Sequence, residues 1–459
     1  MATPYQILVR PQDTGLLRLE QDAAAAAKVT ELLQKDLERH HVFFNAEGFH
    51  NHIPHHLLAL YGTGATPAHL QTAFDTNASY QIKAMKQHPA ALAELRSDWS
   101  AHAHKYLGLG KHYSDFLAFF QSEIQQRGWQ AVVKEFLFDD TPKGVDMLGR
   151  LYSGFLHPMI QLMYGLEWEQ PAVVAEGLAQ AAVHEARIGQ LMTEVDDVAA
   201  KGPFPANRSS VVDMCETVRA SNPKLATSAR WEDPNRIYDG VLARARDDVV
   251  ALMAQIRVKP EELEERTAEM FHTAVYIAAA AAVSNPPHIP KLDFFLMSVP
   301  ITSEPPPPLL LPPSFNAYDW VPLRAKVRML EWKMRMDCVQ YLARGAPPLA
   351  VDAVRSYTPP DSLQLPVVSH PRDLIPCFRD IVDDGHLIKV VRSLLLAQEV
   401  SRPWQSRPWL RIRNDDEWLK LMYMLLGSVH GQPSQWIRSA GFKEAWTGIP
   451  EERVVQAGL

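Results

Sequence analysis

Residues 145–168 read VDMLGRLYSGFLHPMIQLMYGLEW, and their apolar side chains return at helical spacing. The spacing predicts a long, mostly apolar helical stretch that carries His157 immediately before Pro158. The same periodicity recurs on both sides, and an alanine run in residues 21–41 adds helix propensity. The chain is therefore expected to be mainly α, with further helical stretches at residues 21–41, 55–61, 67–85, 113–128, 129–138, 171–195, 209–221, 238–258, 324–345 and 381–400.

Two interruptions divide this helical pattern. Residues 201–210 read KGPFPANRSS, and residues 302–320 read TSEPPPPLLLPPSFNAYDW, which is too rich in proline for a helix or a central strand. The second segment is expected to be an extended surface or covering loop. We expect residues 1–459 to form a single large interlocked helical domain, with a weak subdivision possible near residues 201–210. Only residues 5–10, YQILVR, suit an edge strand.

The composition is that of an ordinary globular protein, with 47% hydrophobic and 22% charged residues. A net charge of -7 and the lack of a basic run argue against nucleic acid and anionic membranes as partners. The cysteines are few, odd in number and far apart, which argues against a disulfide framework and thiolate metal clusters: Cys215, Cys338 and Cys377. The sequence shows neither a signal peptide nor an apolar run long enough for a membrane span, so a cytoplasmic location is expected.

Histidines crowd residues 49–56, FHNHIPHH, where Pro54 suits the start of a helix. His52 and His56 stand four residues apart, a spacing that places two imidazoles on one helical face and is typical of metal ligands. The alternative is that they lie at the surface or cap a helix. His50 and His55 are expected to cap, pack or meet solvent.

Three more side chains could complete such a site. His157 interrupts an apolar stretch, where an imidazole needs a hydrogen-bond partner or a metal. His386 and Lys389 stand one turn apart in VDDGHLIKVVRSLLL, although a lysine in such a place usually reaches solvent. Asp383 and Asp384 resemble solvated charges at a helix start.

Other histidines and motifs are given no chemistry. His184 and His272 interrupt apolar helix faces and are expected to be hydrogen-bonded core residues. Residues 62–68, GTGATPA, contain part of a dinucleotide fingerprint, but the third glycine is missing and a helix precedes them. The remaining histidines of interest lie in polar surroundings: His40, His41, His102, His104 and His112.

Four blocks in this order resemble the questin oxidase-like family of fungal polyketide clusters: HHVFFNAEGFHNHIPHHLLALYGTGA, LYSGFLHPMIQLMYGLEWEQPAVVAEGLAQAAVH, KLDFFLM and DDGHLIKVVRSL. The resemblance runs from about His40 to about Leu396 and so covers most of the chain. It implies oxidative ring opening of anthraquinones by an enzyme with non-haem iron. The iron of a related member is held by histidines and a carboxylated lysine, whose position here is Lys389. A buried neutral amine can add carbon dioxide, and the resulting carbamate is an anionic oxygen donor suited to iron.

The chain departs from the family pattern at two positions. Gln161 stands where relatives tend to have a second histidine in H-P-x-I-H, and Ser298 stands where relatives tend to have the histidine of D-F-F-x-M-H. Gln161 is a candidate weak ligand. The resemblance thus implies a metal set of His52, His56, His157, His386 and Lys389, with pocket residues Gln161, Tyr164, Phe295 and Ser298 and further wall candidates Trp168 and Phe294.

These features favour an Fe(II)-dependent oxygenase that cleaves a ring of an anthraquinone or a related aromatic polyketide with dioxygen. His386 and Lys389 would be central to catalysis. One alternative is a Baeyer–Villiger-type oxidase that uses NADPH and no iron, although a phosphate-binding loop is missing. Another is a metal-free, non-catalytic relative that binds a pathway intermediate, which Gln161 and Ser298 would favour.

Overall fold

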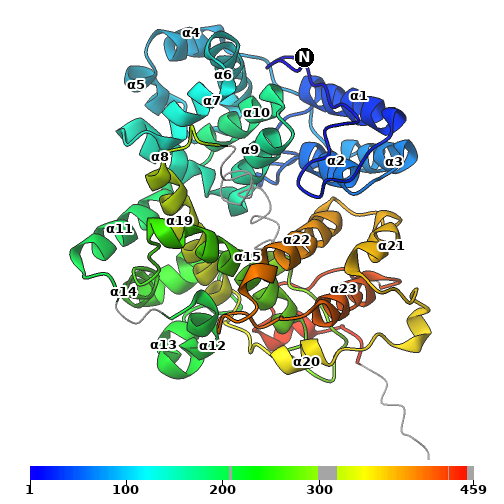
Figure 1. The fold of residues 1–459 in the computed structure, drawn as a ribbon. Coiled ribbons are helices and arrows are strands. Elements are labelled where there is room, and N and C mark those ends of the chain that lie inside the picture. Colours follow the sequence, from blue (N-terminus) through cyan, green and yellow to red (C-terminus); the bar gives the residue numbers. More distant parts are fainter. Residues whose placement is uncertain (206–208, 298–317, 433, 452–459) are drawn as a thin grey trace, which may run out of the picture. The chain divides into compact units, whose positions relative to one another are not determined.

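The computed structural model describes residues 1–205, 209–297, 318–432 and 434–451, and it is built of helices (Figure 1). Within these residues the only β-type pairings are isolated bridges, such as the one between Phe43 and His50. The predicted mainly α class is confirmed. Among the described helices, none combines the length and the apolar character needed to cross a lipid bilayer.

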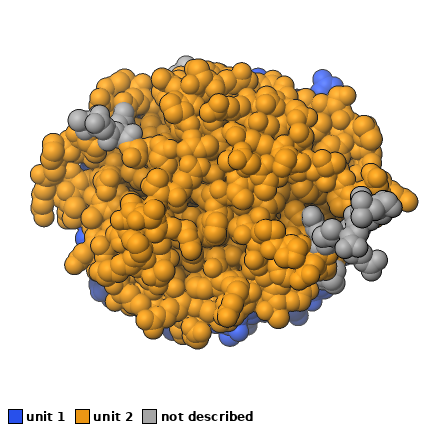
Figure 2. All heavy atoms as spheres, turned by 90° about the horizontal axis from the view of Figure 1, so that it is seen from below, with its two compact units in different colours: residues 1–194, 304–328, 379–392 blue, residues 195–303, 329–378, 393–459 orange. Residues whose placement is uncertain are grey.

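The chain forms two compact units, each assembled from separate segments (Figure 2). Unit 1 comprises Met1–Glu194, Glu304–Arg328 and Arg379–Arg392, and unit 2 comprises Val195–Ser303, Met329–Phe378 and Ser393–Leu459. The units therefore do not follow one another along the chain. The single-domain organisation stays a prediction.

Unit 1 contains the first ten α-helices: α1 (Ala23–Arg39), α2 (Ile53–Gly62), α3 (Pro67–Ala78), α4 (Pro89–Ser97), α5 (Trp99–His102), α6 (Tyr113–Arg127), α7 (Trp129–Val133), α8 (Pro142–Leu151), α9 (His157–Glu167) and α10 (Pro171–Ala182). Helix α10 is buried from Ala172 to its end because nearly all of its side chains are small or apolar, and it packs against α9 and α6. This packing fixes α9, which positions His157.

Unit 2 contains α15 (Leu263–Ala282), which is buried from Arg266 to its end. Its other helices are α12 (Val211–Ser221), α13 (Pro223–Ala226), α14 (Leu242–Met253), α20 (Val351–Arg355) and α23 (Asp415–Val429). Four further helices have residues in both units: α11 (Arg187–Lys201), α19 (Leu323–Ala343), α21 (Ile375–Arg379) and α22 (His386–Ser401).

Several of the predicted helical stretches are shorter or broken. The stretch at 145–168 breaks between α8 and α9, and the stretch at 171–195 breaks between α10 and α11. The predicted helix at 67–85 ends at Ala78, and the one at 381–400 begins only at His386. Apolar periodicity continued across these breaks, so periodicity alone could not locate them.

The prediction of an edge strand at residues 5–10 is wrong. Neighbouring side chains, and not a partner strand, bind the backbone of this segment: the N–H of Ile7 donates to Gln34 (2.9 Å) and the N–H of Val9 donates to Thr30 (2.9 Å), both on α1. The N–H of Leu8 points the other way and donates to Gln170 (3.0 Å). Because α1 and Gln170 satisfy these backbone groups, an apolar alternating run can remain extended without joining a sheet.

The proline-rich segment predicted as a covering loop lies mostly outside the described residues, which resume at residue 318. Ser298 also lies outside them.

Candidate metal centre

Three predicted ligands of unit 1 stand at the beginnings of three helices. His52 immediately precedes α2, His157 is the first residue of α9, and His386 is the first residue of α22. Lys389 follows one turn into α22 and is fully buried. Segments far apart in the sequence therefore converge on one group of side chains, in which His157 is half-buried and the other three are buried.

The two neutral rings of His52 and His157 carry too few N–H protons for the close contacts that their nitrogens make. An additional positive charge is therefore needed between them. Nδ1 of His157 lies 2.7 Å from the carbonyl oxygen of Gly154, and Nδ1 of His52 lies 3.0 Å from that of Asp384. Carbonyl oxygens only accept hydrogen bonds, so each Nδ1 must carry its ring's proton. The two Nε2 atoms, which then hold lone pairs, face each other at 3.0 Å.

Protonation of either ring is a costly way to supply that charge. Burial, together with the charge of nearby Lys389, lowers the pKa of His157 to about 3. Burial and Lys389 also hold the pKa of His52 well below its ordinary value. A divalent metal ion would supply the charge instead, because it binds neutral imidazole lone pairs.

The spacing of the two nitrogens suits this interpretation. Two imidazole nitrogens at about 2.1 Å from one ion and at a right angle to each other are separated by about 3.0 Å. The separation of the two Nε2 atoms is 3.0 Å. His52 and His157 can therefore occupy neighbouring positions of an octahedral ion.

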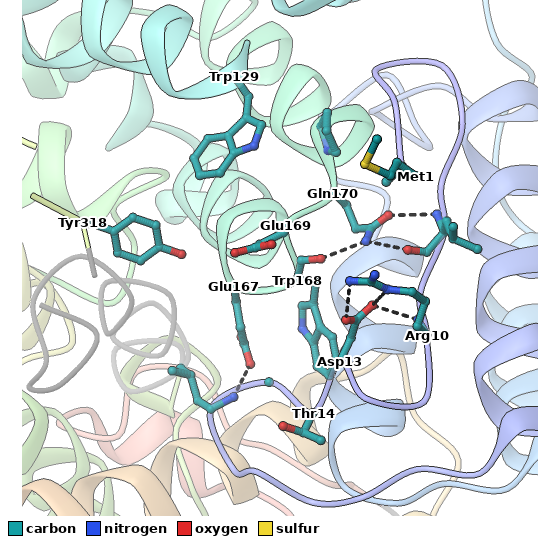
Figure 3. A pocket seen from close by; sticks show the side chains of 15 residues that line it. Met1, Arg10, Asp13, Thr14, Trp129, Glu167, Trp168, Glu169, Gln170 and Tyr318 are labelled. Carbon is teal, nitrogen blue, oxygen red and sulfur yellow. Dashed lines mark hydrogen bonds and ion pairs between the residues drawn. The ribbon is translucent and has the colours of Figure 1, made fainter. Parts of the chain in front are cut away.

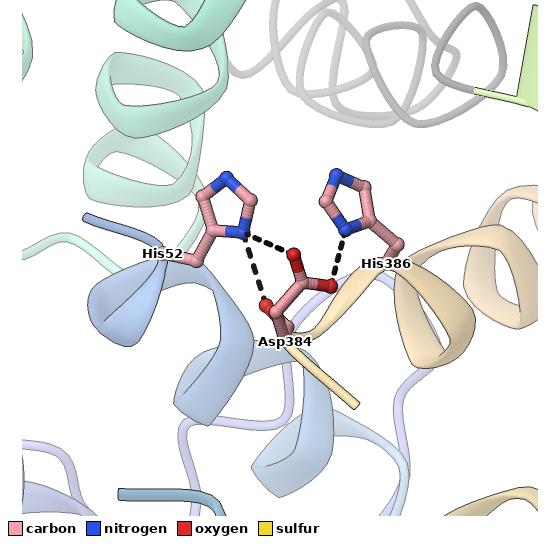
Figure 4. A group of neighbouring side chains, drawn as sticks. All are labelled: His52, Asp384 and His386. Atoms are coloured by element: carbon pink, nitrogen blue, oxygen red, sulfur yellow. Dashed lines mark hydrogen bonds and ion pairs between the residues drawn. The ribbon is translucent and has the colours of Figure 1, made fainter. Parts of the chain in front are cut away.

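Asp384 contacts both His386 and His52 (Figure 4). Nδ1 of His386 donates to the carboxylate of Asp384, while Nδ1 of His52 lies 3.6 Å from the same group. Figure 4 shows both rings turning their other nitrogen to the same side, away from Asp384. The ring centroids of His52 and His386 are 4.7 Å apart. Hydrogen bonds from Nδ1 to a carboxylate or carbonyl commonly orient histidines whose Nε2 binds a metal.

The turn before α22 places Asp384 and His386. The carboxylate of Asp383 accepts hydrogen bonds from the N–H groups of Gly385 (2.9 Å) and Leu387 (2.8 Å). Gly385 has a positive φ of 96°, and a Cβ there would lie 2.4 Å from Cγ of His56. Only glycine suits this position, so the sequence Asp-Asp-Gly-His sets the local geometry.

Lys389 contacts a histidine that was predicted to cap, pack or meet solvent. Its Nζ lies 3.2 Å from Nδ1 of His55, which is buried. One turn further along α22, Arg392 pairs with the buried carboxylate of Glu167 at 2.6 Å and lies over the ring of Tyr164, 5.2 Å from its centroid. The Tyr164 ring is 6.0 Å from that of His55. Lys389 is therefore not a lysine that reaches solvent.

His56 and Gln161 have other contacts. Nδ1 of His56 accepts a hydrogen bond from the amide of Asn77 at 3.3 Å, so its role as a ligand stays a prediction. Gln161 donates to the carboxyl group of Glu176 at 2.9 Å. Burial, together with the charge of Asp36, raises the pKa of Glu176 to about 8.

The predicted pocket residues are spread over both units. Trp168 lines a cavity of about 600 Å³ in unit 1, together with Trp129 and Tyr318 (Figure 3). This cavity lies at the carboxyl end of α9, whereas His157 lies at its amino end. Phe295 and Phe294 belong to unit 2, where the Arg344 guanidinium stacks 4.1 Å from the ring centroid of Phe295.

In a second histidine group, ordinary hydrogen bonds to a carboxylate account for the contacts of the rings. Nδ1 of His88 and Nδ1 of His112 lie 2.9 and 2.7 Å from one oxygen of the buried carboxylate of Asp115. Each neutral ring has one N–H to donate, and a carboxylate oxygen accepts both. This arrangement needs no metal ion.

Sequence reasoning missed Asp384, Gly154 and His50. The pair Asp383 and Asp384 was interpreted as solvated helix-start charge, but the oxygens of Asp384 hold two imidazoles. The sequence Asp-Asp-Gly before a histidine is a usable signal. The glycine permits a turn that brings the preceding carboxylates back to the start of the helix. No local sequence pattern indicated a role for Gly154 or His50.

Known proteins of similar sequence are oxidases. A model of the family described as questin oxidase-like matches residues 49–394. The Baeyer-Villiger oxidase ptaJ of Pestalotiopsis fici is 34% identical, covering 98% of this chain and 99% of the relative. The questin oxidase of Aspergillus fumigatus is 34% identical, covering 98% of this chain and 100% of the relative. The oxidoreductase AflY of Aspergillus parasiticus is 30% identical, with coverage of 98% and 94%. These matches extend over nearly the whole chain, which is therefore an oxidoreductase and belongs to the questin oxidase-like family.

Proposed function

We propose that this protein is a non-haem iron oxygenase that opens a ring of an anthraquinone or a related aromatic polyketide. The oxidative chemistry and the substrate class are supported by relatives named questin oxidase at about 34% identity over nearly the full chain. The observation that carries the metal is the contact of His52 and His157 through their lone-pair nitrogens at 3.0 Å.

In this proposal His52, His157 and His386 supply neutral nitrogen ligands. Each of their Nδ1 atoms is held by an oxygen, which fixes the ring planes and keeps the Nε2 lone pairs directed at one region. Lys389, as a carbamate, would add an anionic oxygen. Three imidazoles and one anion suit Fe(II) and leave coordination positions open, and bound iron would supply the activation of dioxygen.

His55 would orient the modified lysine. A carbamate keeps one N–H on its nitrogen, and Nδ1 of His55 lies 3.2 Å from that atom as the acceptor. The buried pair of Arg392 and Glu167 then restrains the following turn of α22. Because these side chains are buried, little water would reach a bound ion from their side, and its electrostatic interactions there would be stronger.

An NADPH-dependent Baeyer–Villiger oxidase is the second candidate, since several relatives carry the name Baeyer-Villiger oxidase. It would act without iron. The GTGATPA segment is poorly suited to a dinucleotide, because it joins α2 to α3 and does not follow a strand.

Metal content and cofactor dependence test the two candidates together. The protein is purified without oxygen, its iron is counted, and it is mixed with a hydroxylated anthraquinone before air is admitted. We expect about one iron for each chain and ring-opened product without NADPH. Product that requires NADPH and survives removal of iron would contradict the proposal and favour the second candidate.

A further inference from the structure

The chain enters α9 through an unusual turn. Gly154, Phe155 and Leu156 have φ values of 56°, 53° and 63°, so three successive residues are left-handed. This conformation is unfavourable for residues other than glycine, and such conformations cluster at functional sites. Here the turn directs the carbonyl oxygen of Gly154 at Nδ1 of the next helix's first residue, His157.

Three nearly parallel imidazoles stand beside this turn. The ring of His50 stacks on that of His157 with centroids 4.1 Å apart and planes 7° apart. His184 meets His50 edge to edge, with centroids 5.0 Å and planes 10° apart and the two Nε2 atoms 2.8 Å from each other. The flat face of His50 thus sets the plane of His157, and His184 holds the edge of His50.

Unlike the proposed ligands, His50 and His184 carry enough N–H protons for the close contacts that their nitrogens make. Nδ1 of His184 donates to the carbonyl oxygen of Gln180 at 2.6 Å, and Nε2 of His50 donates to Nε2 of His184 at 2.8 Å. Two neutral rings supply the two protons that these two contacts need. The pair is therefore complete without a metal ion and can act as a rigid support.

Gly154 joins the support to the turn. A Cβ on Gly154 would lie 2.4 Å from Nε2 of His184 and 2.9 Å from Nε2 of His50. The absence of a side chain thus lets the histidine pair pack directly against the residue whose carbonyl holds His157.

We propose that His50, His184 and Gly154 are positioning residues that fix the plane and the protonated nitrogen of His157, and so set its affinity for iron. The inference rests on the proposed metal centre. Its consequence is that the shape of the His50 ring matters for metal binding although His50 is not a ligand.

Variants at His50 distinguish a role in orienting His157 from a role in packing alone. We expect His50→Ala to weaken Fe(II) binding about 10- to 100-fold, the usual effect of losing a residue that orients a metal ligand. His50→Phe keeps a flat ring against His157 and should stay within a few-fold of the wild type. His272→Ala is the matched control, because His272 is a fully buried histidine of unit 2.

The measurements are Fe(II) affinity by anaerobic titration and the visible absorption of the Co(II)-loaded protein, both on the full chain. The spectrum should shift in His50→Ala and keep its wild-type form in His50→Phe and His272→Ala. His184→Leu, which removes the acceptor of His50, should weaken binding several-fold and serves if His50→Ala does not fold. Wild-type affinity and spectrum in His50→Ala or His184→Leu, or an equal loss in His50→Phe, would overturn the inference alone. A wild-type protein that binds no iron would overturn the proposed function as well.

Discussion

Asp384 and His386 are separated only by Gly385, and the carboxylate of Asp384 accepts the Nδ1 proton of His386. The same residue accepts the Nδ1 proton of His52 through its backbone carbonyl at 3.0 Å. One residue thus holds two imidazoles that arrive from opposite ends of the sequence.

Replacing the carboxylate should therefore loosen one ligand and spare the other. We expect Asp384→Ala to reduce iron affinity about 10- to 100-fold, because His386 loses its orienting acceptor while the backbone carbonyl still holds His52. Anaerobic titration with Fe(II) measures this. Asp380→Ala is the control, since Asp380 is an exposed carboxylate in the same segment. Unchanged affinity in Asp384→Ala would show that its carboxylate does not serve the site.

Lys389 should be needed for the metal and dispensable for the fold. We expect Lys389→Ala to lose iron and keep its helical circular dichroism, because a ligand is removed while α22 remains packed. A small carboxylate such as acetate should restore part of the iron if the lost group is a carbamate oxygen, and wild-type activity should depend on bicarbonate. Lys291→Met is the control, as Lys291 is a buried lysine that donates to backbone carbonyls of unit 2. An iron-replete, active Lys389→Ala protein would refute the role.

His157→Ala should lose iron and some stability. The carbonyl of Gly154 loses its donor, which costs on the order of 1 to 3 kcal/mol if the carbonyl remains buried. Elemental analysis and chemical denaturation measure the two effects. His104→Ala, at an exposed position, should change neither. Wild-type iron content in His157→Ala would show that His157 has only a structural role.

We expect Gln161 to serve as the hydrogen-bond partner of Glu176 and not as a ligand, since its Nε2 donates to that carboxyl group. We expect Gln161→Leu to keep its iron and to alter the stability of the protein. A loss of iron equal to that of His157→Ala would make Gln161 a ligand after all.

The metal-free protein should lose stability in acid. Burial lowers the pKa of His157, of His56 and, in unit 2, of His272 to about 3. Histidines in the unfolded chain titrate near pH 6.5, so the unfolded state binds protons that the folded state does not. The free energy of unfolding is then at its full value above about pH 6.5 and falls as the pH drops toward about 3. Denaturation of chelator-treated protein across this range measures the slope, and a flat profile would contradict neutral buried histidines.

Much of the fold and part of the site could be predicted from the sequence. Helical periodicity located most helices, and the pairing of His386 with Lys389 one turn apart holds in α22. The break before His157 escaped prediction because Phe155 and Leu156 are left-handed, a conformation that apolar spacing does not signal. The contact of His50 with His184 joins positions 134 residues apart, and the packing of α9 against both α2 and α10 brings them together.

An anomalous difference map at the iron absorption edge, from crystals grown without oxygen, tests the central claim most directly. The account predicts one strong peak about 2.1 Å from Nε2 of both His52 and His157, on the side of His386 that faces away from Asp384. No peak there, or a peak between the Nδ1 atoms and the carboxylate of Asp384, would contradict it.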